Sequence, residues 1–360
     1  MNYPLRAGIL VAGLILAACS DSGDGIAISS APTTTVETVE ESHVLEDGSQ
    51  YSGGLANGKK QGHGTYVWPN GDRYEGQWQD DVMWGQGTFQ DHRGHVYTGN
   101  WKNGEYSGRG TYTWPSGSRY EGQFEAGVKH GNGSYEWADD RVYRGQFKND
   151  LKHGSGTYTW PDGRKYIGQF DRDVRSGVGK MVYPNGEIYD GQFKDGLRDG
   201  SGTQTMADGS IYEGAFSQDQ MVGQGVMEWP SGESYSGEFV DNFPHGKGEM
   251  QWPGGNKYEG RFSAGVMEGE GKLTFSDGRV YDGQFKQGKR TGKGTLTWPS
   301  GEKYTGQFVD GMRDGRGTFT WPDGSKFVGG FQQNALHGRG ICSTDGVDSP
   351  CRFDRGVRIE

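Results

Sequence analysis

The sequence has little cysteine, few aliphatic side chains and little positive charge. Only 3 of its 360 residues are Cys, and the hydrophobic class makes up 31%, against ~45–50% apolar residues, glycine included, in ordinary globular domains. This composition argues against a compact domain with a thick aliphatic core. The 37 Lys and Arg residues against 47 Asp and Glu give a formal charge of −10, which disfavours nucleic acid as the main partner because phosphate binding needs a basic footprint.

Motifs of catalysis are also missing from the sequence. It contains no G-x-S-x-G, P-loop, H-E-x-x-H or EF-hand pattern. Four His share one position in a repeated unit, but two neighbouring His without a third ligand make a poor metal site; they are His130, His153, His245 and His337. We therefore expect no enzyme, no cofactor and no metal.

Glycine and aromatic rings are abundant, and they recur with a fixed period. Gly accounts for 67 residues and aromatics for 13%, and this ring content argues against a disordered chain. The rings stand 23 residues apart without an insertion: Tyr51, Tyr74, Tyr97, Tyr120, Tyr143, Tyr166, Tyr189, Tyr212, Tyr235, Tyr258, Tyr281, Tyr304 and Phe327. Each is followed by Gly after two residues, by Phe or Trp after four in all copies but that of Leu55, and by two more Gly after eleven and thirteen. Such a regular unit predicts a repeat architecture.

The pattern within one unit is that of a β-hairpin. In Gly156–Phe170, Tyr158 and Trp160 are two residues apart, as are Tyr166, Gly168 and Phe170, so each set shares one side of a strand. Pro-Asp-Gly between the two runs is typical of a turn. The segment KNDLKHGSG, residues 148–156, leads into this hairpin and is predicted to link one hairpin to the next. Stacked hairpins predict an all-β fold, a single-layer, elongated, twisted antiparallel sheet in which rings pack over mid-strand glycines.

The unit resembles the MORN repeat (membrane occupation and recognition nexus), through Tyr-x-Gly-x-Phe/Trp, then Gly-x-Gly, then Pro-x-Gly before the next Tyr. We assign residues 44–340 to this array, with about 12 full repeats and partial repeats at the ends. The resemblance implies a single twisted antiparallel sheet and roles in membrane association, scaffolding or self-association.

The first residues resemble the signal peptide of a bacterial lipoprotein. Arg6 precedes an apolar run from Ala7 to Ala18, which is too short to span a bilayer that needs ~20 residues in a helix. Leu16-Ala17-Ala18-Cys19 resembles the lipobox, which implies removal of residues 1–18 and acylation of Cys19; an ordinary signal peptide with a chance Cys is the alternative. Ser20 after the Cys favours the outer membrane within that family, on its periplasmic or outer side.

Two flanking segments complete the predicted organisation. Residues 19–43 form a flexible acidic tether, since residues 20–50 contain seven acids and no Lys or Arg. Residues 341–360 form a C-terminal cap. Its Cys342 and Cys351 suggest a disulfide in an exported protein, with two independent thiols as the alternative.

Two sets of residues are candidate binding sites. Nine residues after the first ring, seven units carry a cation, predicted to lie in the linkers along one edge as a phosphate-contact rim or as a solvated rim: Lys60, Lys129, Lys152, Arg175, Arg198, Arg290 and Arg313. Departures from the repeated pattern suggest a partner patch: Trp84, Tyr106, Met221 and Met267.

These observations favour a non-enzymatic scaffold, tethered to the bacterial envelope, that binds a protein partner or a second copy of itself. The alternative is a binder of glycans, cell wall or phospholipid headgroups, through exposed aromatic rows and the basic rim. Exposed flat rings would favour the glycan binder, whereas rings packed edge to edge would remove its basis.

Overall fold

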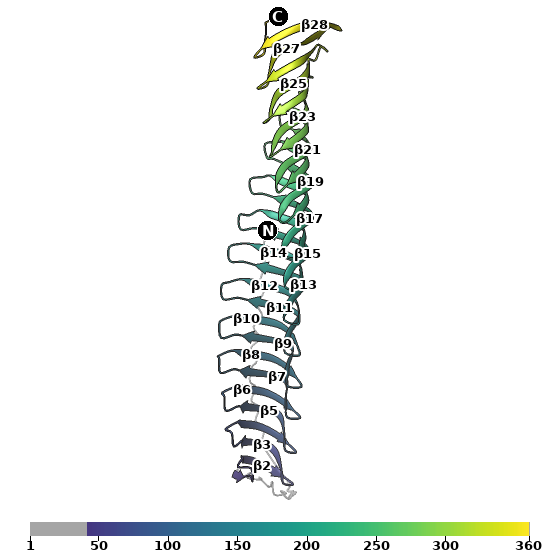
Figure 1. Cartoon of the computed structure of the whole chain (residues 1–360). Helices are drawn as coiled ribbons and strands as arrows, with labels where there is room; N and C mark the ends of the chain where they lie inside the picture. The colour runs from purple at the N-terminus through teal and green to yellow at the C-terminus, as the bar shows by residue number, and fades with distance from the viewer. Residues whose placement is uncertain (1–41, 360) are drawn as a thin grey trace, which may run out of the picture. The chain divides into compact units, whose positions relative to one another are not determined.

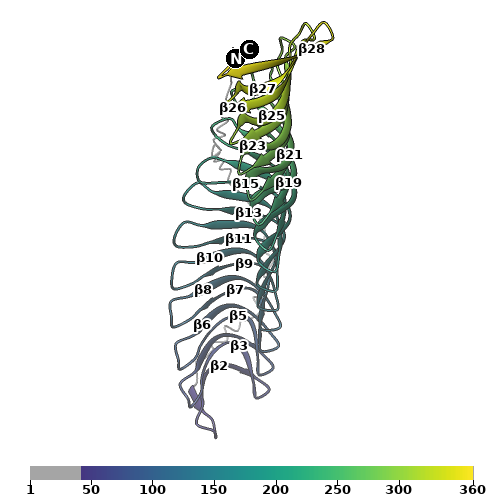
Figure 2. The ribbon, with the colours of Figure 1, turned by 45° about the horizontal axis from the view of Figure 1, so that its top comes forward.

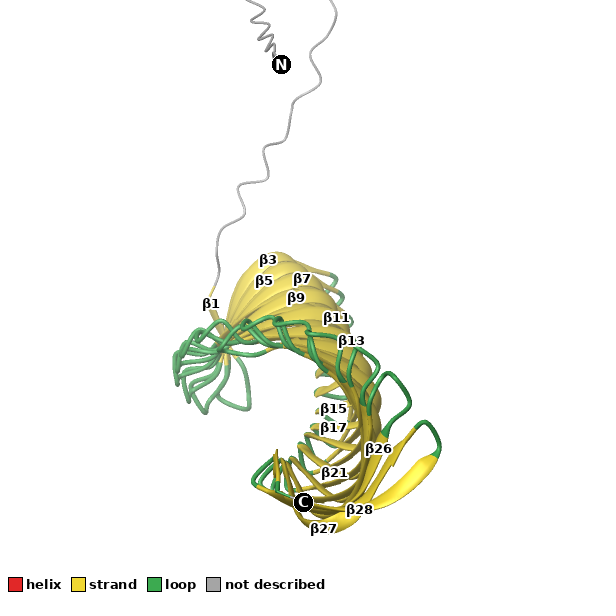
Figure 3. Ribbon diagram, turned by 90° about the horizontal axis from the view of Figure 1, so that it is seen from above, coloured by secondary structure: helices red, strands yellow, loops and turns green. Residues whose placement is uncertain are grey.

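The computed structural model describes residues 42–359, and these form one open antiparallel sheet of 29 strands without a helix (Figure 1). Each strand pairs with the strands before and after it in the sequence. The predicted all-β single-layer fold is confirmed. Turned forward, the ribbon shows its strands stacked as curved rungs (Figure 2); seen from above, the turns gather along its edges (Figure 3).

The strands alternate in length through most of the array, with seven residues followed by nine. Their bounds are β1 Ser42–Val44, β2 Gln50–Ala56, β3 Lys59–Val67, β4 Arg73–Gln79, β5 Val82–Gln90, β6 Val96–Lys102, β7 Glu105–Thr113, β8 Arg119–Glu125, β9 Val128–Glu136, β10 Val142–Lys148, β11 Leu151–Thr159, β12 Lys165–Asp171, β13 Val174–Val182, β14 Ile188–Lys194, β15 Leu197–Thr205, β16 Ile211–Ser217, β17 Gln220–Glu228, β18 Ser234–Val240, β19 Phe243–Gln251, β20 Lys257–Ser263, β21 Val266–Thr274, β22 Val280–Lys286, β23 Lys289–Thr297, β24 Lys303–Val309, β25 Met312–Thr320, β26 Lys326–Gln332, β27 Ala335–Thr344, β28 Val347–Asp354 and β29 Val357–Arg358.

The core is a ladder of aromatic rings on one face of this sheet. The twelve tyrosines of the 23-residue period, which we call the ladder tyrosines, are 0–2% exposed. The ring of Tyr166 meets Phe170 of its own strand and Phe193 of the next repeat edge to face, both with centroids 5.1 Å apart. Such T-shaped pairs are the favoured geometry for aromatic rings, and they continue from repeat to repeat.

Glycine makes room for each ladder ring. Tyr74 lies over Gly76 of its own strand and Gly87 of the next, and a Cβ added to Gly76 would come within 2.5 Å of the Tyr74 hydroxyl oxygen. The hydroxyl donates a hydrogen bond to the carbonyl of Gln77 at 2.9 Å, so the buried polar atom is satisfied. The mid-strand glycines therefore exist because the ring occupies the space of their side chains.

The segments predicted as linkers are strands, which corrects the sequence analysis. Leu151–Thr159, most of which the sequence predicts as a linker, is β11, and only a short turn at Asn149 and Asp150 separates it from β10. A β-bulge at Gly154, where φ is +57°, interrupts the pairing. Gln146 Oε1 accepts a hydrogen bond from the backbone N–H of Ser155 at 3.1 Å, so the amide that the bulge frees has a partner. The bulge shifts the alternation of faces, which concealed the strand from a search for period two.

Both ends of the sheet continue its pattern in modified form. At the start, Ser42–Val44 pairs with β2, and Leu45 and Gly48 make the turn hydrogen bonds that Trp68 and Gly71 make one repeat later. At the other end, β27 pairs with β28, and a disulfide joins Cys342 to Cys351 across them.

Candidate interaction surface

The seven predicted cations lie on strands of the ring-bearing face. We call the place nine residues after each first ring the cation position. Lys152 is the second residue of β11 and stands directly opposite Phe147 of β10, and Arg175 stands in the same way opposite Phe170. Residues directly opposite each other in an antiparallel pair share a face of the sheet, so these side chains lie on the side of the rings.

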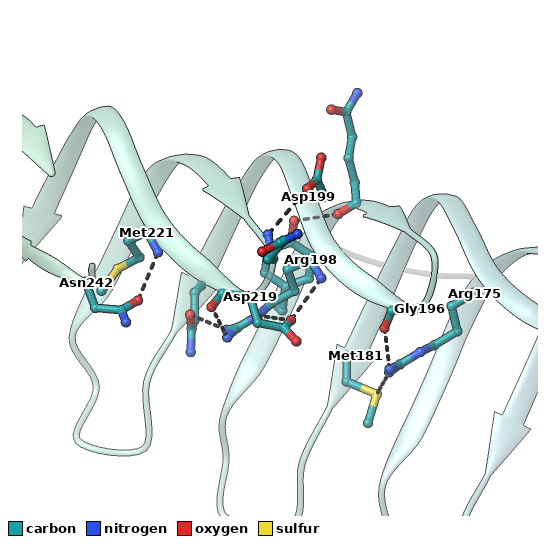
Figure 4. Close-up of polar contacts among 12 residues, drawn as sticks. Arg175, Met181, Gly196, Arg198, Asp199, Asp219, Met221 and Asn242 are labelled. Atoms are coloured by element: carbon teal, nitrogen blue, oxygen red, sulfur yellow. Dashed lines mark hydrogen bonds and ion pairs between the residues drawn. The ribbon is translucent and has the colours of Figure 1, made fainter. Parts of the chain in front are cut away.

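Each cation binds the turn of the following repeat. Lys152 Nζ lies 3.0 Å from an Asp173 carboxylate oxygen. Arg198 Nε donates to Asp219 Oδ1 at 3.0 Å (Figure 4). Where the turn carries Gly in place of Asp, the guanidinium donates to the backbone carbonyl, as Arg175 does to Gly196 at 2.6 Å. These contacts tie neighbouring repeats together along one edge.

The same cations lie over aromatic rings. The Arg313 guanidinium carbon is 5.2 Å from the Trp298 ring centroid, 5.7 Å from that of Tyr304 and 5.6 Å from that of Phe319. These distances suit cation–π attraction. Desolvation by burial lowers the pKa of Arg313, and it also lowers the pKa of Arg290. The expectation of a rim in the linkers is thus corrected: the side chains share one edge, but rings, carboxylates and carbonyls hold them.

The four residues of the predicted partner patch do not form one surface. Tyr106, Met221 and Met267 each occupy the cation position in three different repeats. Tyr106 stacks on Tyr97 with centroids 3.9 Å apart, and Met221 is 6% exposed. Trp84 is one residue further along its strand than Met83, so it faces the other side, and it is 38% exposed. Met83, which was not among the predicted site residues, occupies the cation position of this repeat, and its place nine residues after Tyr74 is the signal in the sequence that identifies it.

An aromatic pocket surrounds Met83. Its volume is about 320 Å³, and its walls are Trp68, Met83, Phe89, Gly104, Trp101, Glu105, Tyr106 and Gly127. Trp68 and Phe89 lie 5.8 Å apart, Phe89 and Trp101 6.3 Å, and Trp101 and Tyr106 4.9 Å, as centroid distances. Trp68 and Phe89 have the repeat positions of the two rings that contact Lys129, Lys152 and Arg313, and Gly104 has the position of the turn residue that binds each cation.

The face away from the rings carries a second feature, an exposed apolar row next to the turns. One residue before the cation position, side chains of this row are 36–55% exposed. We call it the turn-edge row: Val82, Leu151, Val174, Leu197, Phe243, Val266 and Met312. Isolated apolar side chains are common on protein surfaces, but a row that returns at one position of a repeat gives an extended apolar edge.

Other candidate chemistry is sparse in the part of the chain that the structure describes. Between residues 42 and 359 no group of three or more His, Cys, Asp or Glu could hold a metal ion. Within the same range, no helix has the length and apolar character to cross a membrane. Cys19, the predicted site of acylation, and the predicted signal peptide lie outside the described residues.

The repeated geometry agrees with a comparison against protein families. The MORN repeat model matches thirteen times between residues 51 and 347, leaving out only residues 141–142, 164–165 and 279–280 within that span. The chain belongs to the MORN-repeat family. Each MORN match begins at a ladder tyrosine or, in the last copy, at Phe327, and membership in this family favours an interaction or scaffold role.

Solved structures show only weak likeness to this MORN array. The SAS-4 (dCPAP) TCP domain of Drosophila melanogaster, in complex with a proline-rich motif of Ana2 (dSTIL), is 14% identical, with 43% of this chain and 85% of that chain covered and a TM-score of 0.29. The TCP10 domain of Danio rerio CPAP with a STIL peptide is 16% identical, covers 75% and 97%, and has a TM-score of 0.22. Scores this low carry nothing over to the MORN chain. No curated protein matches it.

Proposed function

We propose that this protein is a non-enzymatic scaffold, anchored to the bacterial cell envelope by lipid on Cys19, whose MORN ribbon binds a protein partner. The observation that carries the proposal is the turn-edge row. The ladder tyrosines are buried against one another's neighbours within the sheet and offer no free surface to a partner. By contrast, Leu151, Val174 and Leu197 are 37–43% exposed at equivalent places in successive repeats. Adjacent repeats bring equivalent residues roughly 10 Å apart, two strand spacings, so a partner can contact several of them at once.

The buried ladder weighs against the glycan alternative. A sugar ring stacks on an exposed aromatic face, but the ladder tyrosines are 0–2% exposed and their neighbours meet them edge to face. The cations proposed for phospholipid headgroups are held by turns and rings, with Lys60, Lys129 and Lys152 side chains 15–19% exposed. A protein partner at the apolar edge is therefore the better proposal.

Crosslinking in intact cells, followed by mass spectrometry, tests the interaction. We expect a reproducible crosslinked partner from the unaltered chain and a several-fold loss of it from the triple variant Leu151→Ser, Val174→Ser and Leu197→Ser. The matched control replaces the residues across the same turns, Lys148→Ser, Asp171→Ser and Lys194→Ser, and should keep the partner. Equal capture by the two triple variants would contradict the proposed surface.

Metabolic labelling with radioactive palmitate tests the anchor. We expect Cys19→Ala to abolish the label, because acylation of a lipobox cysteine requires its thiol. The double variant Cys342→Ser and Cys351→Ser is the control and should retain the label. Equal labelling of Cys19→Ala and the unaltered chain would refute the lipid anchor.

A further inference from the structure

Seven repeats show how this ring-bearing face accommodates a cation. In each, a Lys or Arg at the cation position enters a space between rings of two neighbouring repeats and reaches the turn of the next one. For Arg313 the two outer rings are Trp298 and Phe319, and the turn acceptor is the carbonyl of Asn334 at 2.6 Å. Lys129 and Lys152 also lie between two such outer rings, whereas Arg175 and Arg198 contact the ladder tyrosine and the Phe of the next repeat. The turn contact is common to all seven cations, and the pair of outer rings to three of them.

The second repeat retains the surroundings but lacks the cation. Trp68 has the position of Trp298, Phe89 that of Phe319, and Gly104 that of Asn334, while Met83 replaces the arginine. In repeats with a glycine turn, the acceptor is the glycine carbonyl, as Gly196 is for Arg175. No cationic side chain of this repeat enters the space between these rings, and the aromatic pocket of about 320 Å³ lies there beside Met83.

The charges around the pocket are suited to a cation. Glu105 is one of its lining residues. Asp91 does not line the pocket but lies near its wall, since desolvation and also the charge of Asp91 raise the pKa of Tyr106, a lining residue. Although desolvation opposes this, hydrogen bonds from His95 and Arg93 lower the pKa of the Asp91 carboxyl to about 2. Lys60, the bound cation of the preceding repeat, is neutralised by Asp81 at 3.3 Å. A positive side chain entering the pocket would therefore meet aromatic faces and negative charge.

We propose that this aromatic pocket binds a lysine or arginine side chain of a protein partner, which takes the place of the cation that the second repeat lacks. The sequence outside the described residues does not supply a suitable one, since residues 1–41 contain a single basic side chain, Arg6, within the predicted signal peptide. The proposal rests on the proposed scaffold function and names the partner's chemistry at one site.

The test uses the full chain and two peptides that differ only in charge. The first is a short Gly/Ser peptide with one central arginine, and the second has citrulline in its place. The readout is the shift of the Trp68 and Trp101 indole N–H signals in a nuclear magnetic resonance titration. We expect the arginine peptide to bind about tenfold more tightly than its citrulline twin, since a desolvated cation–π contact contributes about 1–2 kcal/mol.

Substitution at the pocket makes the test specific. Met83→Arg supplies the cation from the chain itself and should abolish peptide binding, while the urea midpoint is maintained or raised. The matched control, Met267→Arg, adds the same side chain at the cation position of another repeat and should bind the peptide like the unaltered chain. Trp68→Ala should weaken binding at least fivefold by removing one wall.

Three results would overturn the proposal: equal affinity for the two peptides, unchanged binding by a folded Met83→Arg chain, or loss of binding in Met267→Arg as well. A second copy of this chain as the partner would appear as peptide-sensitive dimerisation that Met83→Arg removes, and would support the site. If the peptide titration gives one of these results while crosslinking still depends on the turn-edge row, the pocket is rejected as a binding site and the scaffold function is retained.

Discussion

Replacing Tyr166 with alanine lowers the free energy of unfolding by about 3–5 kcal/mol, the range for removing a large buried aromatic side chain. Tyr166 is 0% exposed, meets Phe170 and Phe193 edge to face, and donates a hydrogen bond to the carbonyl of Gln169 at 2.9 Å. Its removal leaves a cavity and interrupts the ladder. Because each repeat contacts only its neighbours, the two halves of the array are then expected to unfold less cooperatively. Urea denaturation followed by circular dichroism measures both effects.

Tyr166→Phe is the matched control. It keeps the ring and loses only the hydroxyl hydrogen bond, so the expected loss is about 1 kcal/mol. The chain contains this arrangement already, since Phe327 is 0% exposed at the ring position of the last repeat. If alanine and phenylalanine at position 166 gave the same urea midpoint, ring packing would not be what holds the ladder together.

Raising the pH from about 10 to about 12 unfolds the array. Burial raises the pKa of eight ladder tyrosines to about 12: Tyr97, Tyr166, Tyr189, Tyr212, Tyr235, Tyr258, Tyr281 and Tyr304. Tyrosine in an unfolded chain titrates near pH ~10. Because the folded pKa is the higher one, the stability from these groups is fully present below pH ~10 and is lost as the pH rises through the folded value.

The alkaline transition is followed by tyrosinate absorbance together with the circular dichroism of the sheet. Both should change in one cooperative step, since ionisation requires the rings to leave the ladder. A variant with Lys60→Arg, Lys129→Arg and Lys152→Arg is the control, because arginine stays charged throughout this range, and it should keep the step. Ionisation of these tyrosines near pH ~10 in a sheet that stays folded would contradict the prediction.

Much of the fold follows from the sequence because its cause is local and periodic. The 23-residue interval and the rings two residues before and two residues after a glycine specify one strand face, and the Pro-x-Gly turn specifies the hairpin. The structure confirms the hairpins and the rings packed over glycine. Tyr166, Gly168 and Phe170 share a face as the alternation of a strand requires.

The face on which the residues at the cation position lie was harder to predict, because a β-bulge separates them from the rings of the same strand. At Gly154 the chain inserts an irregularity into β11, so alternation cannot be counted from Tyr158 back to Lys152, and the segment resembles a loop. Whether Lys152 reaches solvent or the Tyr158 ring then depends on pairing with Phe147 in the neighbouring strand, which the sequence of one strand does not specify. For the same reason, the sequence alone did not show that Met83 lies on the ring-bearing face and its neighbour Trp84 on the opposite face.

The contact between each turn and the preceding repeat gives the array a direction. The Lys60 backbone N–H donates to Asp81 Oδ1 at 2.9 Å, and the Asp81 N–H donates to the Lys60 carbonyl at 3.1 Å. Each repeat is thus completed by residues that belong to its successor. The last one is completed by the tail, where the Gly356 N–H donates to the Leu336 carbonyl at 2.8 Å. A chain shortened by whole repeats from the middle keeps this closure, whereas one truncated before Gly356 leaves its terminal rung unfinished.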